Sequence, residues 1–362
     1  MNNETHKILP AFEDKNIPIV FATDIKFIPY LGVAIKSLIS NSSSDNNYDI
    51  VILCNDINEL RQEQIRSMKR KNISIRFYNI SELLNDYKNN LYLRANYSNA
   101  IYYRFFIPQL FVKYNKIIYL DSDLIINCDI AEVYNINLNN AFIGAVKDLP
   151  RLRQGDYYNN FITEKIGIDC NKYFNSGVLL FNLEKLDKEK FFNTCINILN
   201  ILKEPFFPDQ DVFNYIFKNS VLYLDNKYNV SWNCIHFWKD SKKTLPPETY
   251  NKYVENLKHP KIFHYAGEYK PWKQPELLYS EYFWQYARQT SFYEEIIYLN
   301  TKIIPNTRNI IRNAVYRHKI YAQYLKCRIL KFLTFGDVKQ HYSEKTSKLK
   351  KQVRDYRNTL KI

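Results

Sequence analysis

Short apolar runs alternate along this chain with segments whose apolar residues recur at helical spacing. The runs 17–22, 48–54 and 73–80 flank helical patterns at 29–40 and 58–71. Further runs at 116–120, 141–146 and 176–181 are accompanied by helical patterns at 96–112 and 183–202. Strands that alternate with helices predict an α/β fold, in which ligands gather at the carboxyl ends of the strands.

The apolar run 116–120 leads directly into Asp121-Ser122-Asp123, and a second apolar run follows at 124–126. In an extended chain residues i and i+2 point to the same side, so both carboxylates can converge on one cation. Hard ions such as Mg²⁺ and Mn²⁺ take oxygen ligands and leave positions for phosphate oxygens. The alternative is a surface turn that happens to contain two Asp residues.

The seven glycines are scattered and match neither Gly-x-Gly-x-x-Gly nor a P-loop. A nucleotide diphosphate bound by this fold would therefore lack a glycine cradle at a helix N-terminus, and a cation would have to meet its charge.

The segment 264–272 reads His-Tyr-Ala-Gly-Glu-Tyr-Lys-Pro-Trp. His264 is suited to ligate a metal, Gly267 allows close backbone approach, and Lys270 can pair with a phosphate. A single His is more often structural, but beside Asp121 and Asp123 it would complete a set of two carboxylates and one imidazole.

Four further polar residues stand out against apolar surroundings. Asp209 and Gln210 follow Pro208 at an expected helix start, where they either face a sugar at the catalytic centre or complement the helix dipole. Asn175 stands at the mouth of the apolar run 176–181. Arg104, on an apolar helical segment, needs an anionic partner, which is either a structural carboxylate or a phosphate.

Taken in order, these segments resemble glycosyltransferase family 8, the retaining galactosyl- and glucosyltransferases of the GT-A fold. The resemblance implies a single Rossmann-like nucleotide-binding domain at 17–275, with a central, mixed, mainly parallel sheet flanked by helices. A helical packing segment at 276–300 and a helical, basic amphipathic C-terminal extension at 301–362 would follow.

The resemblance also implies a role for each matching residue. The metal, Mn²⁺ or Mg²⁺, would bind Asp121, Asp123 and His264, and the donor diphosphate would lie at 121–123 beside Lys270 and Gly267. The nucleoside and the donor sugar would contact Ala22, Asp24, Arg104, Ser122 and Asn175. Asp209 and Gln210 would be the catalytic residues.

The reaction implied is transfer of galactose or glucose from UDP-galactose or UDP-glucose, with retention, to a hydroxyl of a saccharide acceptor. A lipid-linked acceptor such as lipooligosaccharide or another cell-surface glycan is expected. The rival interpretations are a metal-dependent nucleotidyl or phosphoryl transferase, and a membrane- or nucleic-acid-binding protein driven by its tail, with an inactive body.

The net charge of +14 is concentrated at the C-terminus. Residues 302–361 contain 16 of the 51 Lys and Arg residues but only three of the 37 Asp and Glu residues. The preceding chain is close to neutral. A nucleic-acid-binding protein driven by its tail would leave the ordered polar motifs of the body unexplained, so we expect no nucleic acid as a partner. Apolar residues recur among these cations at helical spacing, which predicts an amphipathic helix. We expect this helix to bind an anionic membrane surface. The alternative is a solvated helix that packs on the body or forms an oligomer.

Six widely spaced Cys residues, without a Cys-x-x-Cys pair, favour reduced thiols in the cytoplasm. The polar residues 1–16 lack the apolar core of a signal peptide, and no run of about 20 apolar residues could span a bilayer. We therefore expect a cytoplasmic protein that lies peripherally on the inner face of the cytoplasmic membrane.

Overall fold

The structure is a computed structural model that describes residues 7–301 except 86, 88–90, 92–97, 149–155 and 232–246. Beyond residue 301 it describes 322, 323, 326, 330, 340, 341 and 343–350. Contacts divide the chain into two compact units, 1–297 and 298–362. Most of the predicted basic extension at 301–362 therefore lies outside the described residues, and its amphipathic character stays a prediction.

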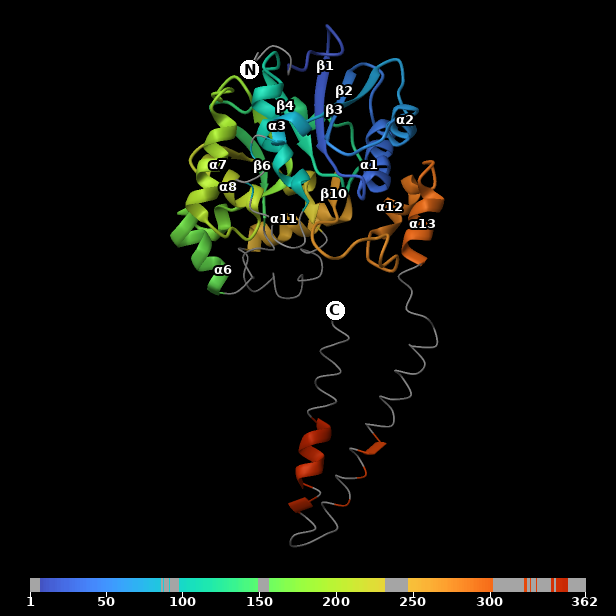
Figure 1. The fold of residues 1–362 in the computed structure, drawn as a ribbon, viewed down its shortest axis with the longest axis vertical. Helices are drawn as coiled ribbons and strands as arrows, with labels where there is room; N and C mark the ends of the chain where they lie inside the picture. The colour runs from blue at the N-terminus through green and yellow to red at the C-terminus, as the bar shows by residue number, and fades with distance from the viewer. Residues whose placement is uncertain are drawn as a thin grey trace. The chain divides into compact units, whose positions relative to one another are not determined.

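A seven-stranded sheet with the order β3-β2-β1-β4-β7-β6-β8 forms the centre of the first unit (Figure 1). Its strands are β1 (Asn16–Ala22), β2 (Asn47–Cys54), β3 (Ile73–Asn79), β4 (Lys116–Leu120), β6 (Ile143–Lys147), β7 (Phe174–Asn182) and β8 (Val221–Tyr223). The pairs β1–β2, β2–β3, β1–β4 and β6–β8 are parallel. Strand β7 is antiparallel to both of its neighbours, so the sheet is mixed.

Helices cover both faces of this sheet, because its strands are apolar on both sides. On β1, Ile17, Ile19 and Phe21 face one core cluster, whereas Val20 and Ala22 face the other. The first cluster is completed by α1 (Ile28–Ser40) and α12 (Ser280–Ala287). The second is completed by α7 (Phe191–Leu202) and α8 (Pro208–Phe217), which lie on the opposite side in Figure 1.

A second, three-stranded sheet lies at the carboxyl end of β4 and has the order β5-β10-β9. Its strands are β5 (Leu124–Ile126), β10 (Ile262–His264) and β9 (Val230–Ser231). Strand β10 is antiparallel to β5 and parallel to β9. The small sheet therefore brings a segment from late in the sequence against the residues that follow β4.

The remaining elements are short or peripheral. They are α2 (Glu59–Arg66), α3 (Ser81–Asn85), α4 (Ile107–Leu110), α5 (Ala131–Tyr134), α6 (Asp156–Asn160), α11 (Pro247–Lys258) and α13 (Tyr293–Thr301), with 3₁₀ segments at Asn99–Phe106, Cys170–Lys172 and Asn226–Tyr228 and a π-helical turn at Phe161–Ile166. Residues 96 and 97 of the predicted helix 96–112 lie outside the described residues, and the rest of that segment contains a 3₁₀ segment followed by one α turn. The predicted helix 183–202 begins only at Phe191.

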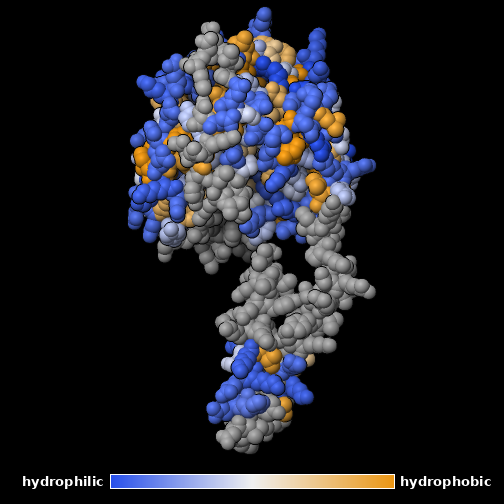
Figure 2. Space-filling model, viewed as in Figure 1, coloured by the Kyte–Doolittle hydropathy of each residue, from blue (hydrophilic) through white to orange (hydrophobic). Residues whose placement is uncertain are grey.

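Among the described residues, no helix is both long enough and apolar enough to cross a bilayer. On the face drawn in Figure 2, apolar residues occur in small groups among polar ones. The Cys residues that the structure describes, at 54, 128, 170 and 195, are free thiols.

Candidate active site

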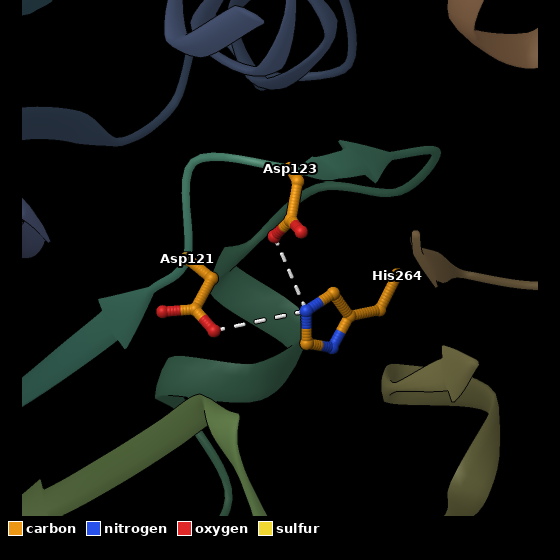
Figure 3. Close-up of side chains that lie close together, drawn as sticks. All are labelled: Asp121, Asp123 and His264. Carbon is orange, nitrogen blue, oxygen red and sulfur yellow. Dashed lines mark ion pairs between the residues drawn. The ribbon is translucent and has the colours of Figure 1, made fainter. Parts of the chain in front are cut away.

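The Asp121 carboxylate is held in place by groups on three elements. Its Oδ1 accepts hydrogen bonds from Tyr119 OH at 2.9 Å and from Arg104 Nη2 at 2.8 Å. Its backbone N–H donates to the carbonyl oxygen of Gly177 on β7 at 2.9 Å. With Oδ1 engaged on one side, Oδ2 faces the opposite side, towards His264 (Figure 3).

His264 reaches the two aspartates because β10 pairs with β5. The register sets His264 opposite Leu124, and the N–H of Tyr265 donates to the carbonyl oxygen of Asp123 at 3.1 Å. The imidazole Nε2 lies 3.2 Å from Asp123 Oδ1 and 3.7 Å from Asp121 Oδ2 (Figure 3). One ligand atom from each of the three residues lies within 4.8 Å of the others, the donor set predicted for a divalent cation.

Lys270 is buried beside this cluster. Its Nζ forms an ion pair with Asp123 Oδ2 and donates to the carbonyl oxygen of Tyr265 at 2.6 Å. Burial acts to raise the pKa of Asp123, but Lys270 and His264 outweigh it and hold that pKa well below its usual range. The carboxylate is therefore ionised and able to ligate a cation at any neutral pH.

Gly177 has no side chain, and the side chains of His264 and Asp121 occupy the space beside it. A β-carbon at this position would stand 2.8 Å from Nδ1 of His264 and 2.9 Å from Oδ2 of Asp121. Because real Cβ contacts do not approach so closely, the absence of a side chain at 177 lets the imidazole ring of His264 lie beside the carboxylate of Asp121. The oxygen and nitrogen donors and the room left for them together fit a divalent cation.

Arg104 connects Asp121, a predicted metal ligand, with Asp209, a predicted catalytic residue. Its Nη1 lies 2.7 Å from Asp209 Oδ2, while Nη2 holds Asp121. The guanidinium stacks 4.3 Å from the ring centroid of Tyr119 and is 5% exposed. Of the two anionic partners predicted for Arg104, a structural carboxylate or a phosphate, the structure contains carboxylates. A contact between Arg104 and the donor stays a prediction.

The side chain of Gln210 is held at both ends. Its Oε1 accepts from the backbone N–H of Ser176 at 3.0 Å, and its Nε2 donates to Asp148 Oδ2 at 2.9 Å. Ser176 Oγ also donates to Asp209 Oδ2 at 2.9 Å. Asn175 joins the same group, with its Nδ2 donating to Asp148 Oδ2 at 3.3 Å. Asp209, Gln210 and Asn175 therefore lie together at the carboxyl end of β4, beside the aspartate pair.

The other predicted residues lie at the rim of this centre. Ser122 Oγ donates to the carbonyl oxygen of Ala22 at 2.9 Å, which ties the aspartate loop to the end of β1. Asp24 Oδ1 accepts from the backbone N–H groups of residues 26 and 27 before α1. Gly267 has φ +83°, a left-handed conformation that favours glycine. Their predicted contacts with nucleoside and diphosphate stay predictions.

Sequence reasoning missed several polar residues that support the centre. Asn229 contacts His264, Asp148 contacts Gln210, and Tyr119 contacts Asp121. None of the three stands in a motif or spacing that marks it as part of a site. Only the strand pairing and the helix packing reveal that these side chains meet.

Comparison with known proteins identifies the family. The sequence model of "Glycosyl transferase family 8" matches residues 18–276, which is more than half of the chain. The chain belongs to glycosyltransferase family 8. Membership in this family assigns it a role in glycosyl transfer and agrees with the resemblance that the motifs indicated.

Relatives within the family come from several bacteria. A lipopolysaccharide 1,2-glucosyltransferase of Escherichia coli K12 is 27% identical over 279 residues, covering 75% of this chain and 78% of the relative. The lipopolysaccharide glucosyltransferase WaaO of the same strain is 26% identical over 89% of this chain and 90% of its own length. General stress protein A of Bacillus subtilis is 24% identical, covering 72% of this chain and 88% of the relative.

Solved structures of family members confirm the predicted GT-A fold. The galactosyltransferase LgtC, solved with donor and acceptor sugar analogues, superposes with a TM-score of 0.64 at 25% identity, covering 76% of this chain and 96% of LgtC. The bifunctional glycosyltransferase WbbM gives a TM-score of 0.70 at 28% identity over 81% of this chain. This chain spans only 53% of WbbM, about half its length.

Proposed function

We propose that this family 8 enzyme transfers galactose or glucose from a UDP-sugar to a hydroxyl of a saccharide acceptor, with retention and with dependence on a divalent cation. The observation that carries the proposal is the convergence of Asp121, Asp123 and His264 at the carboxyl end of β4. Asp209 and Gln210 are connected to this cluster through Arg104 and Ser176.

Asp121, Asp123 and His264 would hold Mn²⁺ or Mg²⁺, which would supply Lewis-acid stabilisation of the negative charge on the leaving diphosphate. Lys270 adds a positive charge beside these ligands, and its ammonium group pairs with Asp123. An electropositive group beside the diphosphate stabilises charge that develops as the glycosidic bond breaks. Ala22, Asp24 and Ser122 would contact the nucleoside end of the donor.

Asp209 and Asn175 would orient hydroxyl groups of the donor sugar, since hydrogen bonds fix both side chains. Gln210 is a neutral amide, and the backbone N–H of Ser176 already occupies its carbonyl oxygen. This hydrogen bond makes the amide oxygen a weaker nucleophile. We therefore favour attack by the acceptor hydroxyl on the same face as the departing diphosphate, whose oxygen accepts the proton of that hydroxyl.

The acceptor we propose is a lipid-linked saccharide such as lipooligosaccharide or another cell-surface glycan. The names of the Escherichia coli relatives, two of which are lipopolysaccharide glucosyltransferases, support this class. The cationic segment 302–361 would hold the enzyme on the anionic inner face of the cytoplasmic membrane, close to such acceptors.

UDP release tests the proposal directly. Purified protein would be incubated with UDP-galactose or UDP-glucose, with and without Mn²⁺, and the UDP formed would be measured. We expect Mn²⁺-dependent release with one of the two donors, abolished by chelation and by Asp121→Ala or Asp123→Ala. Release that is unaffected by chelation would refute the metal-dependent mechanism, and a covalent sugar trapped on Gln210 or Asp209 would refute front-face attack.

A further inference from the structure

We propose that Asn175 and Asn229 form a relay of side-chain amides that fixes which nitrogen of His264 carries hydrogen, and that Asn229 is the positioning residue of the metal site. The proposal rests on the proposed function in one respect, namely that Asp121, Asp123 and His264 bind a divalent cation. It adds a residue outside that ligand set and a physical connection between the cation and the donor sugar.

The relay starts at the backbone of Gly177, whose N–H can only donate. It donates to Asn175 at 2.9 Å, so the atom of Asn175 that receives it must be the oxygen Oδ1. Asn229 approaches the same oxygen at 2.8 Å and must therefore present its amide nitrogen Nδ2. Each amide orientation thus follows from the one before it.

The orientation of Asn229 then determines the hydrogen on His264. With Nδ2 turned to Asn175, the oxygen Oδ1 of Asn229 is the atom that lies 3.0 Å from His264 Nδ1. An oxygen without hydrogen can only accept, so Nδ1 carries the hydrogen in this bond. In the neutral ring Nε2 then has the free lone pair, and Nε2 is the atom that faces Asp121 and Asp123 (Figure 3).

Asn229 is itself held by the backbone around it. Strand β9 begins at the next residue and pairs in parallel with β10, which sets Ser231 beside His264. The preceding 3₁₀ segment is capped by Asp225, which bonds Asn256 of α11. Asn229 is 6% exposed, so water does not compete freely for its amide. These contacts give the amide a defined position from which to orient the imidazole.

The side-chain amide of asparagine meets both requirements of this position. The site needs an acceptor towards His264 and a donor towards Asn175, and one amide supplies both. An aspartate at 229 would keep the acceptor but lose the donor, whereas an alanine would lose both. Since Asn175 is the residue proposed to face the donor sugar, the relay also couples the geometry of the sugar site to that of the metal site.

The test measures Mn²⁺ affinity by electron paramagnetic resonance, with the full chain and saturating UDP, for the wild type, Asn229→Ala and Asn229→Asp. Removing a partner that orients a metal ligand typically weakens metal binding by about 10- to 100-fold. We expect a loss of this size for Asn229→Ala. For Asn229→Asp we expect Mn²⁺ affinity within about threefold of wild type or tighter, because the acceptor for His264 is kept. The donor KM should rise at least about tenfold, because the hydrogen bond that holds Asn175 is lost.

Asn226→Ala is the matched control, because Asn226 lies in the same turn but contacts Asn256 of α11. It should bind Mn²⁺ and donor like the wild type. Mn²⁺ affinity that is unchanged in folded Asn229→Ala would overturn the proposal. If that variant fails to fold, Asn229→Asp decides, and an unchanged donor KM overturns the relay. A wild type that binds no Mn²⁺ would instead refute the proposed function itself, and the relay with it.

Discussion

Gly177 on β7 lies so close to His264 on β10 that a β-carbon at 177 would stand 2.3 Å from Cε1 of the imidazole. We predict that Gly177→Ala moves the imidazole away from the aspartate pair. A displacement of about 1 Å at a reacting centre can cost about 10²-fold in rate, so transfer should fall by that order. Mn²⁺ binding measured beside UDP release should weaken in parallel.

Gly144→Ala on β6 is the control for the added methyl group. There the nearest atoms are the ends of flexible leucine side chains, Leu138 Cδ2 at 2.9 Å and Leu224 Cδ2 at 3.1 Å. Overpacking of this kind costs about 1–3 kcal/mol of stability. The control should therefore lower Tm without changing Mn²⁺ affinity. An equal loss of affinity in both variants would contradict the steric explanation.

Arg104→Met should destabilise the fold as well as abolish transfer. The substitution leaves Asp121 and Asp209 without the guanidinium that bonds both of them. Leaving a buried charge without its partner costs about 3–5 kcal/mol. Denaturant unfolding would measure this loss of stability.

The double variant Arg104→Met with Asp209→Asn separates the two effects of Arg104. Neutralising Asp209 removes one of the unpaired charges, so part of the lost stability should return while transfer stays absent. If the losses in free energy of unfolding for the two single variants add up to the loss in the double variant, the contact between Arg104 and Asp209 contributes little to the fold.

Asp211 predicts a pH dependence of stability. Burial raises the pKa of Asp211 to about 6, although hydrogen bonds from Tyr173 and from the backbone N–H of Phe207 act to lower it. Between pH 4 and 6 the folded protein therefore holds a proton that the unfolded chain has lost, and this contribution to stability disappears as pH rises through about 6. At about 1.4 kcal/mol per pKa unit, the change is of the order of 2–3 kcal/mol.

Asp211→Asn should remove this dependence, because an amide does not titrate. Urea unfolding between pH 4.5 and 7.5 would show the variant gaining stability relative to wild type as pH rises. A difference between the two proteins that stays constant over this range would contradict the assignment to Asp211.

Replacing Lys345, Lys348 and Lys350 by glutamate should weaken binding to phosphatidylglycerol vesicles. Each cation near an anionic surface contributes about 1 kcal/mol, so reversing three charges should lower partitioning by at least about 10²-fold. UDP release in solution should be unaffected. A body variant with the same change of charge, at the exposed residues Lys69, Lys71 and Lys113, is the control and should keep vesicle binding.

The sequence predicted those parts of the fold whose pattern is long enough to recognise. The strands β1, β2 and β4 and the helix α1 were predicted within one or two residues, because their apolar runs are continuous or regularly spaced. For α8 only the start at Pro208 was predicted, and the structure confirms it. The small sheet was missed, since its strands contain only two or three residues each. A run of that length carries no periodicity.

The same limit applies to the site. Asp121 and Asp123 were predicted because charged residues between apolar runs are uncommon. His264 was predicted as their third ligand because an imidazole completes such a donor set and because the ordered motifs resemble those of the family. Asn229 was missed, because a single asparagine after a 3₁₀ turn has the same sequence signature as any turn residue. Its contact with His264 depends on the pairing of β9 with β10, which is decided by packing between distant segments.

The pairing of β5 with β10 also has a consequence for the nascent protein. Both aspartates leave the ribosome well before the imidazole that completes their set, and the strand that carries the imidazole can pair only after residue 264 has been synthesised. A cation captured earlier would meet two oxygen ligands without nitrogen. During synthesis the complete site can therefore form only once β10 can pair with β5, so a cation held by all three ligands stabilises a fold in which these two strands have already met.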